Sequence, residues 1–361
     1  MTKAAASTDP VLDVRGLSVG FASGRAVVPA VHDVGFALRP GETLALVGES
    51  GSGKSVTSLA VMRLLPPAPR TRVSGSALLR GRDGTVRDLL GLPDAEMRAL
   101  RGDEIAMIFQ EPMTSLNPVH RIGDQIAEAI RFHRGIDRGA ALRRAERLID
   151  RVGIPAARQR MGAYPHELSG GMRQRVMIAM ALGCDPTVLM ADEPTTALDV
   201  TVQAQILELL KDLQAETGMG IVFVTHNLGV VAEVADRVMV MYAGRIVERG
   251  GVVPVMTGPL MPYTRGLIAS VPRLDLKGGA MASISGTVPD PRSPPPGCAF
   301  APRCPHDVPD LCGVSVPPLD EVRPGHLVRC CRWAAVAAET AAVAADAASP
   351  AQSAPAPEPQ P

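Results

Sequence analysis

The chain has 361 residues, more than one compact domain of ordinary size. Its 37 basic and 37 acidic residues cancel, so net charge gives no reason to expect nucleic acid as the main partner. Residues 1–10 have one Lys and no apolar core, so we expect no signal peptide. The longest apolar runs, such as 176–184, are shorter than the roughly 18 residues of a membrane span. We therefore expect a soluble or peripheral protein made in the cytosol, where cysteines stay reduced and bind metals more often than they form disulfides.

Residues 11–270 predict an α/β domain with a mostly parallel sheet. Short apolar runs rich in Val and Ile are typical of strands that are buried on both faces, and they occupy 43–48, 105–110, 187–192 and 221–226. A helix is expected over 203–218 and a hairpin over 238–250 with its turn at 243–244. The buried face of this helix should consist of Ile206, Leu209, Leu210 and Leu213. The helix should end at Gly218.

Composition divides the rest of the chain. Residues 120–185 have helical patterns and little strand signal, which indicates a helical subdomain within the α/β domain. We expect a disordered tail at 1–10, a Pro-, Gly- and Ser-rich linker at 271–297 and a cysteine-rich module at 298–333. Residues 334–361 are nearly all Ala, Pro, Glu, Gln and Ser, which predicts a second disordered tail.

A glycine-rich loop follows the first predicted strand. Residues 48–55 read GESGSGKS and match the pattern G-x-x-x-x-G-K-[ST] between a strand and a helix. Backbone N–H groups and the helix N-terminus would hold phosphates, Lys54 would reach the β- and γ-phosphates, and Ser55 would bind Mg²⁺. The alternative is a glycine-rich turn without a ligand. The predicted nucleotide-binding residues are Gly48, Glu49, Ser50, Gly51, Ser52, Gly53, Lys54, Ser55 and Val56.

Polar residues end the other three predicted strands. Asp192 is placed to hold Mg²⁺ through water, and Glu193 is placed to polarise the attacking water as a general base. Gln110 would sense Mg²⁺ and this water, and His226 would contact the γ-phosphate. Ligands of open α/β sheets bind at the carboxyl ends of strands, so these residues predict one shared site.

A second anion-binding motif lies at 168–175, which read LSGGMRQR. A Ser and two Gly precede a helical pattern, as in other anion sites at helix N-termini. The loop at Lys54 already accounts for one triphosphate. Our hypothesis is therefore that Ser169, Gly170 and Gly171 cap the γ-phosphate bound to a second subunit. ATP would then hold together a head-to-tail pair of subunits.

Together these motifs resemble the ATP-binding subunits of ABC transporters. Residues 48–55 resemble their Walker A motif, 109–112 their Q-loop, 168–175 their signature, 188–194 their Walker B motif, 197–199 their D-loop and 225–227 their switch histidine. The resemblance covers 11–270 and implies a P-loop NTPase fold with a mostly parallel core sheet, an antiparallel β part, a helical insert and a small C-terminal cysteine-rich module. It also implies hydrolysis of ATP with Mg²⁺. The site residues added by the resemblance are Phe21 against adenine, Leu168, Arg173 and Gln174 in the signature, and Asp199 in the D-loop.

The segments 110–119 and 261–272 and the cysteine-rich end resemble the oligopeptide/dipeptide importer subfamily, which includes nickel importers. This resemblance implies a subunit that powers import of peptides or a related small solute from the cytoplasmic face of the inner membrane. The implied partners are two integral-membrane permease subunits, a second ABC ATPase subunit (a paralogue or another copy) and, indirectly, an extracytoplasmic solute-binding protein, with no nucleic acid. The alternatives are an exporter ATPase and a soluble ABC ATPase acting on nucleic acid or ribosomes. The latter predicts a basic groove, a long coiled coil or fused ATPase domains, which the sequence lacks.

Five of the six cysteines lie between 298 and 331. A module below about 40 residues usually needs a metal or a cross-link to fold. Four thiolates suit an iron–sulfur cluster, and the spacing lacks the short knuckle of common zinc ribbons. Some members of the resembled subfamily carry a [4Fe–4S] cluster in such a tail. The expected ligands are Cys298, Cys304, Cys312 and Cys330.

Alternatives to this cluster stay open. Cys331 could replace Cys330 as the fourth ligand. Zn²⁺ could be bound instead, with help from His306 or His326, or the cysteines could be free or redox-active. Cys184 lies in an apolar helical pattern and is expected in the core.

Overall fold

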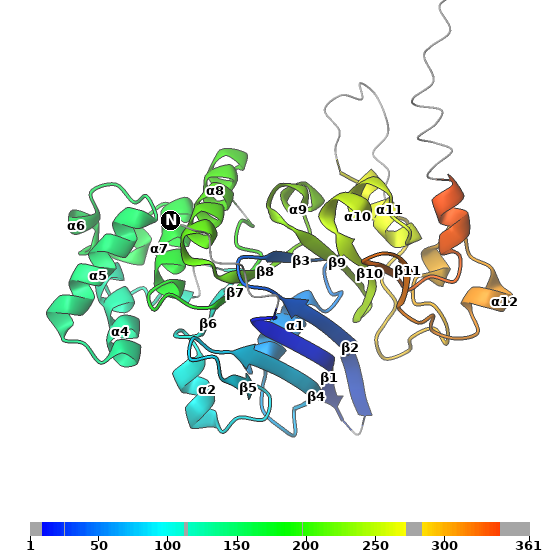
Figure 1. The fold of residues 1–361 in the computed structure, drawn as a ribbon, viewed down its shortest axis with the longest axis horizontal. Helices are drawn as coiled ribbons and strands as arrows, with labels where there is room; N and C mark the ends of the chain where they lie inside the picture. The colour runs from blue at the N-terminus through cyan, green and yellow to red at the C-terminus, as the bar shows by residue number, and fades with distance from the viewer. Residues whose placement is uncertain (1–8, 25, 112–114, 197, 272–283, 340–361) are drawn as a thin grey trace, which may run out of the picture.

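The computed structural model describes residues 9–24, 26–111, 115–196, 198–271 and 284–339. Two sheets and their covering helices organise these residues (Figure 1). The strands are β1 (Leu12–Ser23), β2 (Ala26–Leu38), β3 (Thr43–Val47), β4 (Thr71–Arg80), β5 (Val86–Asp88), β6 (Ile105–Ile108), β7 (Val188–Asp192), β8 (Gly220–Thr225), β9 (Arg237–Tyr242), β10 (Arg245–Gly251), β11 (Asp320–Arg323) and β12 (His326–Val328). The helices are α1 (Lys54–Val61), α2 (Asp94–Leu100), α4 (Ile122–Arg134), α5 (Arg138–Arg151), α6 (Ala157–Arg160), α7 (Gly170–Ala181), α8 (Val200–Thr217), α9 (Leu228–Val234), α10 (Val252–Thr257), α11 (Pro262–Ala269) and α12 (Pro309–Cys312), with 3-10 turns η1 (Pro165–Glu167) and η2 (Ala301–Arg303).

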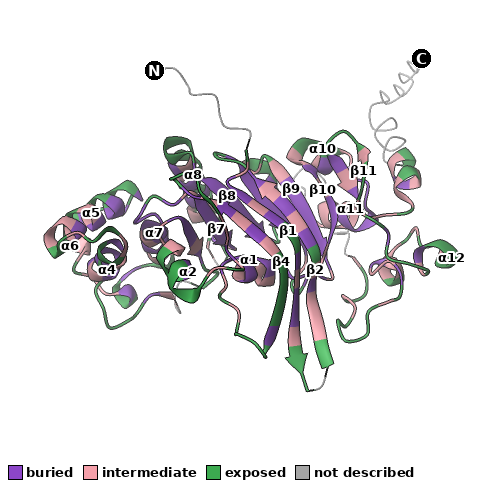
Figure 2. Ribbon diagram, turned by 60° about the horizontal axis from the view of Figure 1, so that its bottom comes forward, coloured by how far each residue is buried: buried purple, intermediate pink, exposed green. Residues whose placement is uncertain are grey.

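The larger sheet has eight strands in the order β11-β12-β10-β9-β3-β8-β7-β6. Its strands β9, β3, β8, β7 and β6 pair in parallel, and every residue of β3, β7 and β8 is buried (Figure 2). Continuous Val, Ile and Leu runs give this result because both faces of a parallel sheet are covered. The prediction of a mostly parallel sheet is confirmed, and the predicted antiparallel part is the sheet β2-β1-β4-β5.

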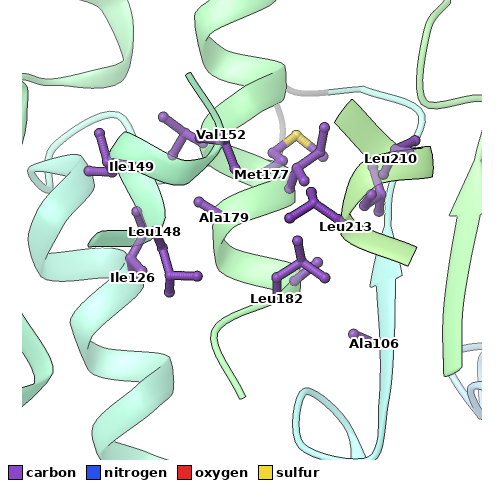
Figure 3. Packing of buried hydrophobic residues seen from close by; sticks show 14 of the residues in the cluster. Ala106, Ile126, Leu148, Ile149, Val152, Met177, Ala179, Leu182, Leu210 and Leu213 are labelled. Atoms are coloured by element: carbon purple, nitrogen blue, oxygen red, sulfur yellow. The ribbon is translucent and has the colours of Figure 1, made fainter. Parts of the chain in front are cut away.

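The chain between β6 and β7 packs against the large sheet through one apolar cluster (Figure 3). Its described residues form α4, α5, α6, η1 and α7. Ile126 of α4, Leu148 of α5 and Ala179 of α7 meet in this cluster, which continues to Leu210 of α8 and Ala106 of β6. These helices are therefore joined to the strands that carry the candidate site.

Two predicted elements differ only in detail. The helix expected from 203 begins at Val200, because the Asp199 carboxylate caps it by accepting a hydrogen bond from the N–H of Val202 at 2.9 Å. Leu207 is buried on this helix, whereas Leu209 is only partly buried. The predicted hairpin is formed by β9 and β10, with its turn at 243–244.

The cysteine-rich segment joins the large sheet. Strand β12 pairs with β10, and the Phe300 ring lies 5.3 Å from that of Tyr242 and 5.4 Å from that of Tyr263. His326 is buried with its Nε2 2.8 Å from Oε1 of the buried Glu248. The cysteine-rich module expected at 298–333 thus shares a core with the rest of the chain, so a metal is not its only source of stability.

The expected tail and linker also differ from the structure. Disorder was predicted from 334, but residues 333–339 are helical, because Val336 is buried and Glu339 forms an ion pair with Arg265 of α11. Residues 284–297 have no helix or strand, and several of them line a cavity described below. Most of the tail expected at 1–10, the linker residues 272–283 and residues 340–361 lie outside the described residues.

Phe300→Ala should lower the free energy of unfolding by about 3–5 kcal/mol, because it removes a fully buried ring from this shared core. Leu311→Ala, in the same segment but 46% exposed, should change it by less than about 0.5 kcal/mol. Urea unfolding can follow far-UV circular dichroism and the fluorescence of Trp333, the only tryptophan. Equal small effects of both substitutions, or separate transitions for the two signals, would contradict a shared core.

Candidate active site

The predicted phosphate loop connects β3 to α1. Gly48, Gly51 and Gly53 have φ of 156°, 77° and 106°, and the last two angles lie in the left-handed region that favours glycine. A Cβ atom on Gly48 would lie 2.2 Å from the carbonyl oxygen of Met241, so the loop also requires glycine where it crosses the end of β9. The loop leads directly into the first turn of α1, where backbone N–H groups have no helical partner.

Lys54 is buried at the start of α1. Its Nζ donates hydrogen bonds to the carbonyl oxygens of Gly48 at 2.8 Å and Glu49 at 3.0 Å. Burial lowers the pKa of Lys54, and the carboxylates of Glu193, Asp192 and Glu49 oppose that shift. Both acceptors belong to the loop, so the ammonium group is held against the loop backbone.

Asp192 ends β7 and faces α1. The Ser55 hydroxyl donates to its Oδ1 at 3.1 Å. Burial raises the pKa of Asp192, and the hydrogen bond from Ser55 works in the opposite direction. A buried carboxylate next to a hydroxyl is a suitable oxygen pair for Mg²⁺, either directly or through water.

Glu193 is the centre of a hydrogen-bonded group. Its Oε2 accepts from Gln110 Nε2 at 3.2 Å and from the Thr196 hydroxyl at 2.8 Å, and its Oε1 lies 3.1 Å from His226 Nδ1. Burial raises the pKa of Glu193, but the hydrogen bonds from His226 and Thr196 and nearby positive charge outweigh it and bring this pKa below its ordinary value. The backbone of Glu193 has φ of 47°, and such strain is typical of functional sites.

A cavity of about 420 Å³ lies over the loop. The predicted site residues that line it are Ser50, Gly51, Gly53, Lys54, Ser55, Val56, Gln110 and Glu193. Asp192 and His226 do not line the cavity, but each is hydrogen-bonded to a residue that does, Asp192 to Ser55 and His226 to Glu193. The structure therefore brings together the ends of all four strands that the sequence singled out.

Phe21 and the residues of 168–174 do not line this cavity. Phe21 of β1 packs against an apolar cluster. Ser169 caps α7 by accepting from the N–H of Met172 at 3.3 Å, and the Nε of Arg173 donates to the carbonyl of Pro165 at 2.7 Å. Leu168 and Gln174 are buried. The helix α7 lies with α4, α5 and α6, on the side of the molecule away from β10 (Figure 1).

Sequence reasoning missed three contacts to the site. Thr196 is close enough in sequence to Glu193 to have been a candidate. Tyr263 of α11 accepts a hydrogen bond from the N–H of Glu49 at 2.8 Å, and Arg303 forms an ion pair with the Glu49 carboxylate. No local pattern marks these last two, because they come from 214 and 254 residues further along the chain.

The five C-terminal cysteines line one small cavity, together with His306. Cys312 Sγ and Cys331 Sγ are 3.4 Å apart, and burial raises the pKa of Cys304 to about 11 and that of Cys330 to about 12. Among the described residues, no group of three His, Cys, Asp or Glu side chains could hold a single metal ion. His326 does not line this cavity, and Cys184 is buried in the core as predicted.

The cysteine-rich segment also reaches the phosphate loop. Cys298 and Phe300 of this segment line the cavity over Lys54, together with Val288 and Pro289 from the residues just before it. The reason is the docking of this segment on β10.

No helix among the described residues has the length and apolar character needed to span a membrane.

Comparisons with known proteins agree with this geometry. The family model described as "ABC transporter" matches residues 31–196, and the one described as "Oligopeptide/dipeptide transporter, C-terminal region" matches 247–312. A Brucella melitensis protein named for ATP binding in peptide import is 57% identical over 338 residues, 92% of this chain and 100% of the relative. The oligopeptide transport ATP-binding protein OppD of Salmonella typhimurium is 50% identical over 329 residues, 91% of this chain and 96% of the relative.

A solved structure shares the fold. The ATP-binding cassette MJ0796, a dimer in a post-hydrolysis state bound to ADP and Pi, has a TM-score of 0.58 and 27% identity, and the match covers 67% of this chain and 98% of that chain. The loop, the acidic pair and the parallel sheet define a P-loop NTPase. More narrowly, the chain belongs to the ATP-binding subunits of ABC transporters, an ATPase family.

Thr196→Val should raise the pKa of Glu193, because it removes a hydrogen bond that favours the charged carboxylate. Thr196→Ser keeps the hydroxyl and should leave the pKa unchanged. The titration can be followed by the carboxyl ¹³C resonance of Glu193, assigned by its absence in Glu193→Gln. A pKa that is equal in both Thr196 variants would show that this hydroxyl does not stabilise the carboxylate.

Proposed function

We propose that this chain hydrolyses ATP to power the import of peptides or a related small solute through partner membrane subunits. The relatives named for peptide import or oligopeptide transport match nearly the whole chain, and the second family model matches 247–312, which extends beyond the ATPase domain expected at 11–270. An exporter ATPase or a soluble ABC ATPase acting on nucleic acid or ribosomes has no such support.

The observation that carries the ATPase mechanism is the Glu193 carboxylate, which is held by Gln110, Thr196 and His226 at the edge of the loop cavity. We assign Glu193 as the base that accepts a proton from the attacking water. Because the pKa of Glu193 is not raised above the ordinary value of a glutamate, this carboxyl is ionised at neutral pH, as a base requires. Gln110 and His226 orient this carboxylate and lie where the water and the γ-phosphate would be.

Nucleotide binding falls to the loop and the first turn of α1. The backbone N–H groups of Gly51 and Gly53 and the ammonium group of Lys54 would bind the phosphates. Ser55 and Asp192 are hydrogen-bonded to each other and would hold Mg²⁺. The side-chain oxygen of Gln110 would be a further ligand. Bound Mg²⁺ would neutralise charge that develops on the phosphates during hydrolysis.

A second ATPase subunit would complete the site. Within one chain, Ser169, Gly170, Gly171 and the other signature residues do not line the cavity over Lys54. Ser169 caps the N-terminus of α7, and Gly170 and Gly171 begin the helix, an arrangement that favours binding of an anion from outside the chain. The related cassette that was solved as a dimer supports this pairing. We place Asp199, the cap of α8, in the same interface.

The other partners follow from an importer role. Two integral-membrane permease subunits would take up the motion of the ATPase pair, and an extracytoplasmic binding protein would deliver the solute. The chain would then act as a peripheral subunit at the cytoplasmic face of the inner membrane, without nucleic acid.

We also propose a [4Fe–4S] cluster at Cys298, Cys304, Cys312 and Cys330 or Cys331, with Zn²⁺ as the alternative. The support is that all five thiols line one cavity. A cluster separates its thiolates more widely than a single ion, because iron and sulfide atoms lie between them, so the lack of a single-ion site does not conflict with it. When bound, the cluster would replace the protons that burial keeps on these thiols.

Glu193→Gln should reduce kcat for ATP by about 10²–10⁴-fold, because the amide cannot accept a proton. The affinity for ATP should be retained, since Glu193 is not among the loop residues that bind the phosphates. The matched control is Glu208→Gln, at an exposed position of α8. Steady-state ATPase assays and nucleotide titration of the assembled transporter measure both quantities. Unchanged turnover in Glu193→Gln would remove this residue from the mechanism.

Protein purified without oxygen should contain iron and acid-labile sulfide and should absorb broadly in the visible range. Cys304→Ser should lower both contents, whereas Cys184→Ser in the distant core should not. Metal analysis of the three proteins provides the measurement. A colourless wild-type protein without zinc would reject both metal proposals, and a zinc-containing one would reject the cluster.

A further inference from the structure

Glu49 is unusual because it places a carboxylate in the phosphate loop, next to the site for a polyanion. This carboxylate does not point freely into solvent: its side chain is 27% exposed, and Arg303 holds both of its oxygens. Arg303 Nη1 lies 2.7 Å from Oε2, and Nη2 lies 3.0 Å from Oε1. Such a bidentate pair fixes the carboxylate in orientation as well as in position.

The guanidinium group of Arg303 is itself fixed from several sides. Its side chain is only 5% exposed. The Nε donates to the carbonyl of Ser285 at 2.9 Å, and Nη2 also donates to that of Ile284 at 3.2 Å. The cation lies 5.8 Å from the ring centre of Tyr242 and 5.9 Å from that of Phe300. Because the guanidinium group of Arg303 is fixed, it can also fix the Glu49 carboxylate that it binds.

The backbone of Glu49 is held as well. Its N–H donates to Tyr263 Oη, and its carbonyl oxygen accepts from Lys54 Nζ. Arg303 is therefore separated from the phosphate-binding lysine by one residue, Glu49. It reaches that residue from the cysteine-rich segment, where it immediately precedes Cys304.

We propose that Arg303 is a positioning residue for the phosphate loop, which neutralises the Glu49 carboxylate and holds the loop in the shape that binds the phosphates of ATP. The proposal rests on the proposed ATPase function and adds a residue from outside the ATPase motifs. Without Arg303, the Glu49 carboxylate would stand unpaired beside the phosphates and repel them. The loop would also lose one of the groups that hold it in place before the nucleotide arrives.

A purely structural role for Arg303 predicts different kinetics. Partial unfolding would reduce the amount of active protein, which lowers apparent kcat and leaves KM unchanged. A misplaced phosphate loop should instead weaken ATP binding and leave the chemical step intact. The reason is that Arg303 does not contact Glu193, Gln110 or His226. KM and the Kd for ATP should rise, and kcat should change little.

Arg303→Gln should therefore raise KM and Kd for Mg·ATP about tenfold, the effect of losing one well-placed charged interaction, with kcat within about threefold of wild type. Arg303→Lys keeps a cation but not the fork and should be intermediate. The double variant Glu49→Gln with Arg303→Gln should recover much of the loss, because no unpaired carboxylate is left. Arg292→Gln, at an exposed position shortly before the cysteine-rich segment, is the matched control and should behave as wild type.

The assays use the assembled transporter, and Trp333 fluorescence reports whether the segment stays folded. A folded Arg303→Gln protein with wild-type KM would overturn the proposal, and so would a double variant no better than Arg303→Gln. If Arg303→Gln unfolds the segment, Arg303→Lys decides: a raised KM supports the proposal and a wild-type KM rejects it. Failure of wild-type protein to hydrolyse ATP would instead contradict the proposed function.

Discussion

The parallel pairing of β3, β8, β7 and β6 is the constraint on which the site depends. Their register places the phosphate loop, Gln110, the acidic pair and His226 at the same edge of the sheet. A parallel sheet requires long crossover connections. Here these connections contain α1, the helices α4 to α7 between β6 and β7, and α8. The helices cover both faces of the sheet, so the strands are apolar throughout and polar chemistry is confined to their ends (Figure 2).

The sequence was most informative where chemistry and local structure coincide. The strand–loop–helix pattern at Lys54 and the polar strand ends pointed to one edge of the sheet. At that edge the structure has Ser55 hydrogen-bonded to Asp192 and Gln110 to Glu193. The strand ends can be located from sequence because parallel strands place their carboxyl ends at the same edge of a sheet. The roles assigned to the residues, and the signature motif in particular, depend on a nucleotide and a second subunit that one chain does not contain.

The C-terminal segment shows where sequence reasoning ends. Its composition suggested a linker and a small module that depends on a metal. It instead joins the sheet at β10 and places Phe300 against Tyr242 and Tyr263. Pairing between strands that are far apart in the chain leaves little local signal, so neither this docking nor the pair Arg303–Glu49 could be read from spacing. The short helical stretch beyond Trp333 was missed for the same reason, since Val336 is buried only in the folded chain.

A structure of the assembled transporter with Mg²⁺ and a non-hydrolysable ATP analogue would test the central claim most directly. Our account places the β- and γ-phosphates over the loop at Lys54, Mg²⁺ beside Ser55 and Asp192, and the Glu193 carboxylate facing the γ-phosphate. It also places Ser169 of the partner ATPase, or the equivalent residue of a paralogue, against that phosphate from the opposite side. A nucleotide bound elsewhere, or one whose γ-phosphate lies out of reach of Glu193, would contradict the account.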